Sequence, residues 1–359
     1  MPTLTIATPH DTAELTEFLQ LRDKVAARRD AYWPASMRFE LQFLQGRTPF
    51  NTGRTIRPFL VRSGRSVVAR VLAVIDAHYQ RHWQEQLGHL WWFEAQPDST
   101  EAVQLLMDEA CAWLQSQGAT AARAGSGALD FPFVIDAYNI LPPNILRQNP
   151  PYYHALLKNA GFASEKGWVD YKIAVRPHLL DRWASMLEAA TRAGYDIIPV
   201  REVPLDRRVS EFTATFNETF QSHWGWTPYS EDEVASLFTA LESFGVLDAS
   251  VLAYHQGQVV GMLLLTPEHS RHAVLAPGRV LRPDEKLNVL AIGVKETARG
   301  RGVNLAMAGY GLLELVRRGA QYVSYTLVLD DNWPSRRTGE KLGGQVCANY
   351  MVYRREFRS

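Results

Sequence analysis

The sequence has little cysteine and no excess of charge of either sign, and each shortage excludes a class of protein. Its two cysteines, Cys111 and Cys347, lie too far apart for a metal-binding motif or a disulfide framework, so we expect two small buried side chains and no metal. Lys and Arg total 38, as do Asp and Glu. A nucleic-acid or anionic-membrane binder carries a basic surplus, so we expect neither partner.

Long apolar runs are also missing. No stretch approaches the roughly 18 consecutive apolar residues that a membrane helix needs. The first residues lack the basic and apolar regions of a signal peptide, and we expect a cytoplasmic protein. Hydrophobic residues make up 46% of the chain and charged residues 21%, which is typical of globular proteins, and 359 residues favour two domains.

A strand, helix, strand order occurs twice along the chain. The first helical pattern stops at Gly118 and the second at Gly319, and glycine suits the left-handed position that ends a helix. Each copy closes with a short helix, a glycine turn and a final strand, with Gly161 in the first copy and Gly343, 182 residues later, in the second. Two unrelated halves would also show single matches of this kind, but the ordered set predicts a duplication. We place the boundary at residue 176, giving domains 1–175 and 176–359.

A glycine-rich turn, Arg-Gly-Arg-Gly-Val-Asn at 299–304, contains the residues most indicative of a binding site. The apolar run from Val289 to Val294 predicts a buried strand before it, and a helical pattern begins near Val303. Such a turn directs unpaired backbone N–H groups outward at the positive end of the helix dipole. The sequence therefore predicts an anion cradle.

The residues of the cradle suit a phosphate. Gly300 and Gly302 allow a ligand to approach the backbone, and Arg299 and Arg301 supply charge-assisted contacts to a pyrophosphate or a 3′-phosphate. A P-loop needs Lys and Ser or Thr after its last glycine, which are absent, and Leu305 replaces the third glycine of a dinucleotide-binding fingerprint. Both of those nucleotide sites are disfavoured.

At this point the chain resembles a known family. Arg299-x-x-Gly302-x-Asn304 after an apolar strand resembles motif A of the GNAT superfamily of N-acetyltransferases, Q/R-x-x-G-x-G/A, which cradles the pyrophosphate of coenzyme A; Asn304 departs from the usual Gly or Ala. The run Asn332-Trp-Pro-Ser335, followed by Glu-Lys-Leu-Gly-Gly at 340–344, resembles motif B. The two motifs occur in the expected order, which is more specific than either alone.

The resemblance implies the fold and the reaction. The implied fold class is α+β, with two tandem GNAT-like domains, each a mixed and mostly antiparallel sheet flanked by helices, in a layout similar to that of mycothiol synthase. The implied reaction is transfer of an acyl group from acetyl-CoA or another acyl-CoA to a primary amine of a small molecule or peptide, by direct attack in a ternary complex. The residues implied to bind the acyl-CoA are Ile292, Val294, Arg299, Gly300, Arg301, Gly302, Val303, Asn304, Asn332 and Ser335.

The first half lacks the cradle. At the equivalent strand-to-helix turn it has Phe-Glu-Ala-Gln-Pro-Asp-Ser-Thr at 93–100, with no glycine and two acids. Acidic side chains repel phosphate, so we expect a degenerate domain that does not hold coenzyme A in the same way.

The catalytic groups are harder to assign. Leu290 occupies a position where the family often has a glutamate base, and Gly339 the position of its usual tyrosine acid. We therefore consider Glu285 and Asn288 for the base and Tyr350 for the acid, with Tyr310 and Tyr353 as alternatives to Tyr350. A thiol pKa of about 8.5 lets the thiolate leave with little help, so a missing acid does not exclude catalysis.

Clustered aromatic residues suggest the acceptor side. His223, Trp224 and Trp226 follow a helical pattern at the place where the GNAT layout shapes its acceptor cleft, and they either clamp a substrate or pack on the core. Two other functions stay open. One is a non-catalytic acyl-CoA sensor, suggested by the missing Glu and Tyr, and the other is an aminoacyl transferase, against which the neutral charge argues.

Overall fold

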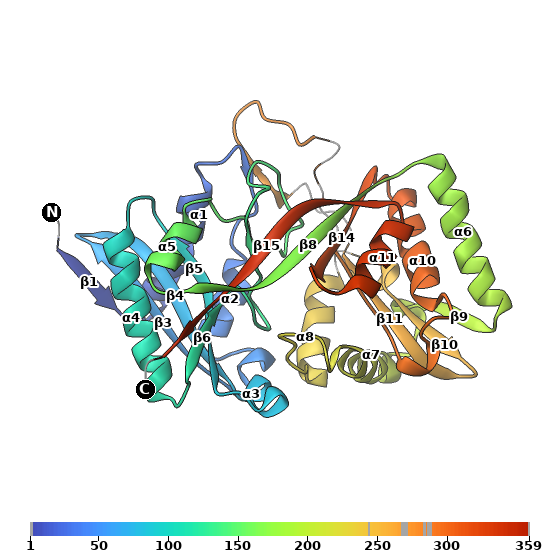
Figure 1. Ribbon diagram of the computed structural model, residues 1–359, viewed down its shortest axis with the longest axis horizontal. Helices are drawn as coiled ribbons and strands as arrows, with labels where there is room; N and C mark the ends of the chain where they lie inside the picture. The colour runs from blue at the N-terminus through green and yellow to red at the C-terminus, as the bar shows by residue number, and fades with distance from the viewer. Residues whose placement is uncertain (1–2, 243–244, 267–271, 283–284, 286–288, 358–359) are drawn as a thin grey trace.

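Two lobes share one long sheet in the computed structural model of the chain (Figure 1). The structure describes residues 3–242, 245–266, 272–282, 285 and 289–357. Helices flank the sheets of both halves, of which the long one is mixed and the smaller one antiparallel, so the predicted α+β class is confirmed. In the described part of the chain, no helix has the length and apolar character needed to cross a membrane.

The first half begins with a strand and two helices and ends with a strand that leads into the second half. Its strands are β1 (Leu4–Ala7), β2 (Ala31–Tyr32), β3 (Arg54–Ser63), β4 (Ser66–Asp76), β5 (Leu87–Ala95), β6 (Ala121–Ala124), β7 (Phe133–Val134) and β8 (Ala163–Ala174). Its helices are α1 (Thr12–Ala26), α2 (Met37–Leu44), α3 (Ala77–Trp83), α4 (Thr100–Ser116) and α5 (Tyr153–Asn159), with a short 3₁₀ helix at Pro49–Asn51.

The second half repeats this order after one additional helix. Its helices are α6 (Pro177–Arg192), α7 (Leu205–Phe220), α8 (Glu231–Glu242), α9 (Val246–Ala249), α10 (Val303–Arg317) and α11 (Trp333–Lys341), with short 3₁₀ helices at Val200–Glu202 and Glu296–Ala298. Its strands are β9 (Tyr195–Pro199), β10 (Val251–His255), β11 (Gln258–Thr266), β12 (Val274–Leu275), β13 (Val289–Val294), β14 (Tyr322–Leu329) and β15 (Gly344–Glu356).

The two halves exchange their final strands. One sheet has the order β1-β3-β4-β5-β6-β15-β8-β14, and β7 also pairs with β15. The last strand of the chain, β15, therefore lies beside β6 of the first half, whereas β8 of the first half lies beside β14 of the second. Figure 1 shows β8 and β15 crossing together from one lobe to the other. The boundary predicted at residue 176 follows β8 in the sequence, but the sheet itself continues across it.

A smaller sheet completes the second half, in the order β13-β11-β10-β9. Buried side chains of this sheet and of α10 and α6 form one core, which includes Trp183, Leu263 and Met307. The apolar run 289–294 forms a strand, β13, and the helix α10 begins at Val303, as predicted. The strand lies at a sheet edge and Ile292 and Val294 are only half-buried, so the predicted burial is not confirmed. Gly118 and Gly319 follow α4 and α10 with φ of 89° each, so both predicted helix ends are confirmed.

Candidate functional site

The edges of the two sheets face a common cavity that residues of both halves line. β13 is the edge strand of the smaller sheet, and β14 is the edge strand of the longer one. An edge strand presents backbone N–H and C=O groups away from its paired neighbour. Residues 291–294 of β13 and 325–328 of β14 line a cavity of about 730 Å³. The backbone of both strands therefore lies beside the space between the sheets.

The predicted anion cradle lies at one end of this cavity. Gly302 is the N-cap of α10 with a φ of 79°, and Gly300 has a φ of 76°, a conformation that residues with a side chain rarely adopt. A Cβ placed on either glycine would have no heavy atom within 4 Å, so the space over the turn is open. Nε of Arg299 donates to the carbonyl oxygen of Val294 at 3.1 Å, which ties the turn to the end of β13.

Cationic side chains without carboxylate partners lie on the turn and on the neighbouring helix α11. Asn304 Nδ2 donates to Oγ1 of Thr338 at 3.1 Å, which brings the first turn of α10 against α11. Within the described residues, no ion pair engages the cations of the turn at 299–302 or of α11. These cations are Arg299, Arg301, Arg336, Arg337 and Lys341. The chain is neutral overall, but this entrance carries a local positive charge that suits phosphate groups.

Motif B supplies a hydroxyl pair to the cavity wall. Asn332 caps α11 by accepting the backbone N–H of Ser335 at 3.2 Å. The Ser335 Oγ lies 2.6 Å from the Tyr325 hydroxyl, and both residues line the cavity. Burial raises the pKa of Tyr325 to about 12, so the phenol keeps its proton at neutral pH. Tyr325 carries no functional signal in the sequence, because it lies in a strand whose pattern indicates only burial.

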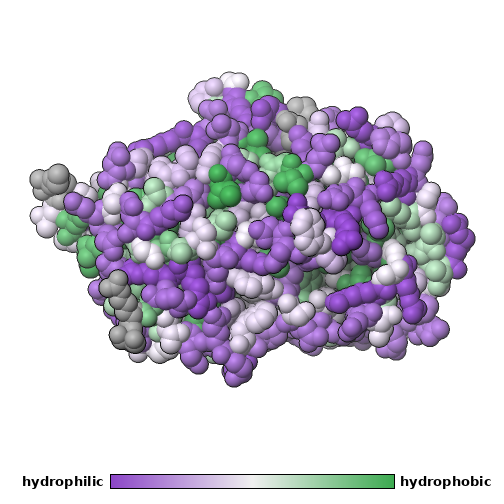
Figure 2. All heavy atoms as spheres, in the orientation of Figure 1, coloured by the Kyte–Doolittle hydropathy of each residue, from purple (hydrophilic) through white to green (hydrophobic). Residues whose placement is uncertain are grey.

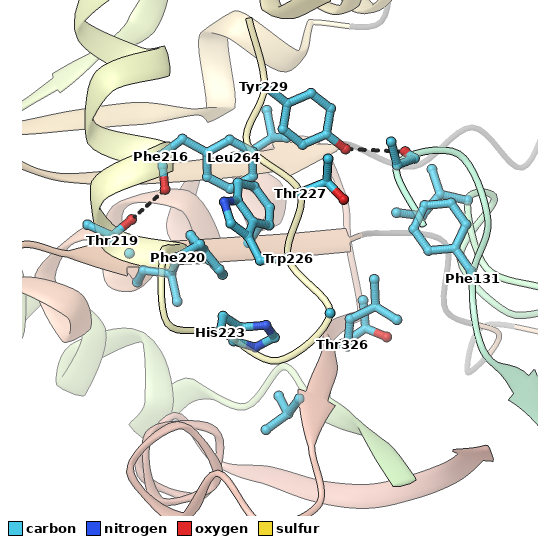
Figure 3. Close-up of a pocket in the computed structure, with 18 of the residues that line it drawn as sticks. Phe131, Phe216, Thr219, Phe220, His223, Trp226, Thr227, Tyr229, Leu264 and Thr326 are labelled. Carbon is cyan, nitrogen blue, oxygen red and sulfur yellow. Dashed lines mark hydrogen bonds between the residues drawn. The ribbon is translucent and has the colours of Figure 1, made fainter. Parts of the chain in front are cut away.

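The aromatic segment predicted for the acceptor side does line the cavity. His223, Trp224 and Trp226 lie on the loop between α7 and α8, and Figure 3 shows His223 and Trp226 beside Phe220. Burial lowers the pKa of His223 to about 4, so this imidazole is neutral at physiological pH. The Trp224 ring also packs 4.4 Å from the guanidinium carbon of Arg123 in the first half.

The structure places two of the three predicted catalytic residues, Glu285 and Tyr350, outside the cavity wall. Glu285 is 6% exposed, does not line the cavity, and binds Arg279 through both carboxylate oxygens, which lowers its pKa. Tyr350 is 2% exposed in a core cluster with Trp168, and burial raises its pKa well above the usual value. Asn288 lies outside the described residues. Neither Glu285 nor Tyr350 is therefore placed to act as an acid or a base in the cavity.

Most of the predicted acyl-CoA residues are brought together. Seven of them line the cavity, namely Ile292, Val294, Arg299, Gly300, Asn304, Asn332 and Ser335. Arg301 is exposed beside the turn, Gly302 caps α10, and Val303 is buried at 1% exposure, so these three shape the cradle from outside the cavity wall.

The first half fills the equivalent place with its own side chains. Its counterpart of β13 is β5, which pairs with β4 and leads into α4. The phenol of Tyr153 accepts the backbone N–H of Ala95 at 2.9 Å, and the phenol of Tyr152 donates to the Ala95 carbonyl oxygen at 2.8 Å. Arg147 donates to the carbonyl oxygen of Phe93 at 2.8 Å. Side chains thus engage the outward backbone atoms of β5 at Phe93 and Ala95, whereas in β13 Arg299 bonds the Val294 carbonyl oxygen.

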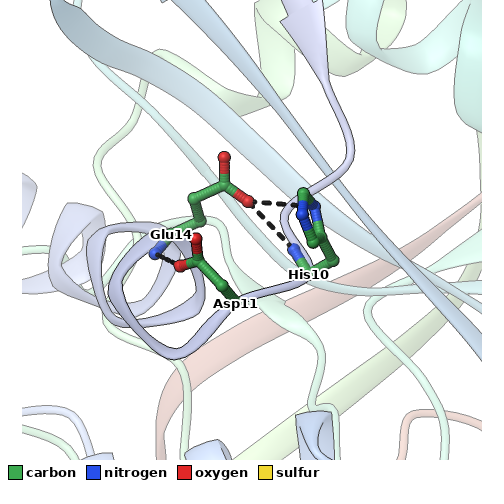
Figure 4. A group of neighbouring side chains, drawn as sticks. All are labelled: His10, Asp11 and Glu14. Atoms are coloured by element: carbon green, nitrogen blue, oxygen red, sulfur yellow. Dashed lines mark hydrogen bonds and ion pairs between the residues drawn. The ribbon is translucent and has the colours of Figure 1, made fainter.

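One surface cluster has metal-binding residue types. His10, Asp11 and Glu14 place a ligand atom each within 4.8 Å of the others (Figure 4). Asp11 caps α1 by accepting the N–H of Glu14, and Glu14 accepts the N–H of His10. These bonds are those of an exposed helix cap.

The fold has counterparts among solved structures. A tandem GNAT protein from the clavulanic acid biosynthesis pathway matches with a TM-score of 0.62 at 14% identity, covering 99% of this chain and 100% of that one. A GCN5-related N-acetyltransferase from Sphaerobacter thermophilus matches with a TM-score of 0.56 at 16% identity, covering 99% and 96%.

Sequence similarity to known proteins covers less of the chain than the structural matches do. No protein-family model matches the chain. Protein YghO of Escherichia coli (strain K12) is 21% identical over 183 residues, which are 50% of this chain and 46% of that protein. The chain therefore matches less than half the length of this relative.

Proposed function

From the tandem GNAT fold that these structural matches establish, we propose that the chain is an acyl-CoA-dependent N-acyltransferase acting on a primary amine. The observation that supports this most directly is the continuity of three features along one cavity. An open glycine turn with unpaired cations lies at one end, two edge strands face the middle, and an aromatic chamber lies beyond them.

The residues present fit an acyl-CoA. The N-terminus of α10, with Arg299 and Arg301 beside it, suits a pyrophosphate, and the outer edge of β13 suits an amide-containing pantetheine arm. Bound there, the cosubstrate supplies an activated acyl thioester. The cavity walls orient the acceptor and exclude water, and Tyr325 and Ser335 hold protons at their hydroxyl oxygens beside the same cavity.

Thermal shift with acetyl-CoA, followed by detection of free thiol across a panel of amines, tests the proposal. We expect stabilisation and transfer to at least one amine. Arg301→Glu should abolish the stabilisation, because it reverses charge at the cradle. Arg65→Glu is the matched control, since Arg65 is an exposed arginine in the first half.

The same experiment separates the alternative functions. Stabilisation without transfer to any amine would favour a non-catalytic acyl-CoA sensor. No stabilisation by any acyl-CoA would contradict both the transferase and the sensor.

A further inference from the structure

The part of the cavity beyond the two edge strands is an aromatic chamber that both halves build. From the second half, α7 and the following loop contribute Phe216, Phe220, Trp226 and Tyr229. From the first half come Trp92 and Phe131. Figure 3 shows Phe131 facing the loop that carries Trp226 and Thr227 from the opposite side of the pocket. Apolar side chains also gather near the middle of the hydrophilic surface, between the two lobes (Figure 2).

The aromatic wall is held in place before any ligand arrives. The Trp226 ring centroid lies 4.6 Å from that of Phe216 and 5.1 Å from that of Phe220. Nε1 of Trp83 in the first half donates to the Trp226 carbonyl oxygen at 2.7 Å, and the Tyr229 hydroxyl donates to the Ala128 carbonyl oxygen at 3.2 Å. A fixed pocket loses little conformational freedom when it binds a rigid ring.

Polar atoms in this wall have no partner. Within the described residues, no hydrogen bond engages the buried indole nitrogens of Trp168 and Trp226 or the buried hydroxyls of Thr227 and Thr326, and all four residues line the cavity. Each of these atoms is itself buried, so a ligand in the chamber meets the faces and edges of the aromatic rings rather than these polar atoms.

The charges of the chamber wall are balanced. Glu40 and Asp130 line its first-half end, but Glu40 pairs with Arg22 at 3.2 Å and Asp130 pairs with Arg147. His223 is neutral because burial lowers its pKa to about 4. A polyamine with several positive charges would meet little net negative charge here.

We propose that the acceptor is a small aromatic primary amine, bound between the Trp226 loop and the first-half loop at Phe131. This inference rests on the proposed N-acyltransferase function for the role of the amine. It assigns to the degenerate first half a part in acceptor recognition. The same apolar surface could instead belong to a long acyl chain, and the experiment below separates the two sources.

Binding and transfer are measured separately. Tyramine, hexylamine and spermidine are titrated into the full chain by tryptophan fluorescence in the presence of coenzyme A, and transfer is then followed with acetyl-CoA and octanoyl-CoA. We expect tyramine to bind roughly tenfold more tightly than either aliphatic amine, and acetyl-CoA to serve at least as well as octanoyl-CoA.

Phe131→Leu and Trp226→Leu should each raise the Kd and KM for tyramine roughly tenfold, with the Kd for acetyl-CoA unchanged. Trp113→Leu is the control, because Trp113 packs against Phe59 outside the cavity wall. Melting temperatures of all three variants show whether they fold.

Three results would overturn or separate the proposals. Equal binding of spermidine or hexylamine would contradict the aromatic acceptor. A preference for octanoyl-CoA that Phe131→Leu abolishes would assign the chamber to the acyl chain. Tyramine binding that depends on Phe131, without transfer to any amine, would support the chamber and contradict the transferase.

Discussion

The ring of Tyr325 occupies the space that a side chain at position 339 would need. A Cβ on Gly339 would lie 2.8 Å from Cδ1 of Tyr325, closer than carbon atoms pack. In the GNAT resemblance, position 339 is that of the tyrosine acid. Here a phenol reaches α11 from β14 instead, and its hydroxyl contacts Ser335 at 2.6 Å in the cavity wall.

Tyr325→Phe should therefore slow acyl transfer without weakening acyl-CoA binding. The phenol holds a proton beside the cavity, and a thiolate leaving group needs only modest help, so we expect kcat to fall roughly ten- to hundredfold. Steady-state kinetics and calorimetry with acetyl-CoA measure the two effects. Tyr310→Phe is the control, because Tyr310 does not line the cavity. An unchanged kcat in Tyr325→Phe would exclude the role.

Local patterns in the sequence predicted the elements of the site, but not the pairing between distant ones. The strand at 289–294 and the glycine turn at 300 and 302 can be predicted from the sequence, because an apolar run and closely spaced glycines are local patterns. The exchange of β8 and β15 leaves no signal in the sequence, since the final strands of the two halves have the same pattern. The engagement of Glu285 by Arg279 and the contact of Tyr325 with Ser335 likewise depend on how loops and sheets pack.

The cations around the turn should select for the 3′-phosphate of coenzyme A. Arg301 and Arg337 flank the contact between α10 and α11, and neither has a carboxylate partner among the described residues. We expect wild type to bind coenzyme A more tightly than dephospho-coenzyme A, and Arg337→Glu to reduce that preference roughly tenfold. Calorimetry with both ligands measures the ratio. A ratio that Arg337→Glu and the control Arg65→Glu leave equally unchanged would contradict the assignment.

A buried ion pair should couple the stability of the two halves. Arg54 of the first half contacts Glu233 of α8 and donates to Asp76 at 2.8 Å, and all three side chains are almost fully buried. Glu233→Gln leaves the buried guanidinium with one charged partner, so we expect a loss of about 3 kcal/mol in the free energy of unfolding. Urea denaturation measures it. The exposed Glu231→Gln on the same helix is the control, and an equal effect of both changes would be evidence against the coupling.

Two buried histidines should make the fold less stable in mild acid. Burial lowers the pKa of His89 and of His223 to about 4, whereas an unfolded histidine has a pKa of about 6.5. Between these values the unfolded chain binds more protons, so stability rises with pH across this window. His223→Gln should lower the slope of the unfolding free energy against pH between 4 and 6.5 by the amount that corresponds to about one bound proton. The exposed His10→Gln is the control, and equal slopes in both variants would refute the prediction.

The chain should bind one acyl-CoA, in the second half. In the first half, Tyr152, Tyr153 and Arg147 already bond the backbone of β5 at Ala95 and Phe93. The turn that follows carries Asp98 and none of the glycines and arginines of the second half, so its charge does not suit phosphate.

Isothermal titration with acetyl-CoA measures the stoichiometry, and we expect about one site per chain, which Arg301→Glu abolishes. A second site that survives Arg301→Glu would mean that the β5 contacts open for ligand. Tyr153→Phe separates that case, because it frees the Ala95 N–H without adding charge. We expect the stoichiometry of Tyr153→Phe to stay at about one. Freeing a backbone group does not supply the missing positive charge, so the acidic turn still excludes the phosphate groups.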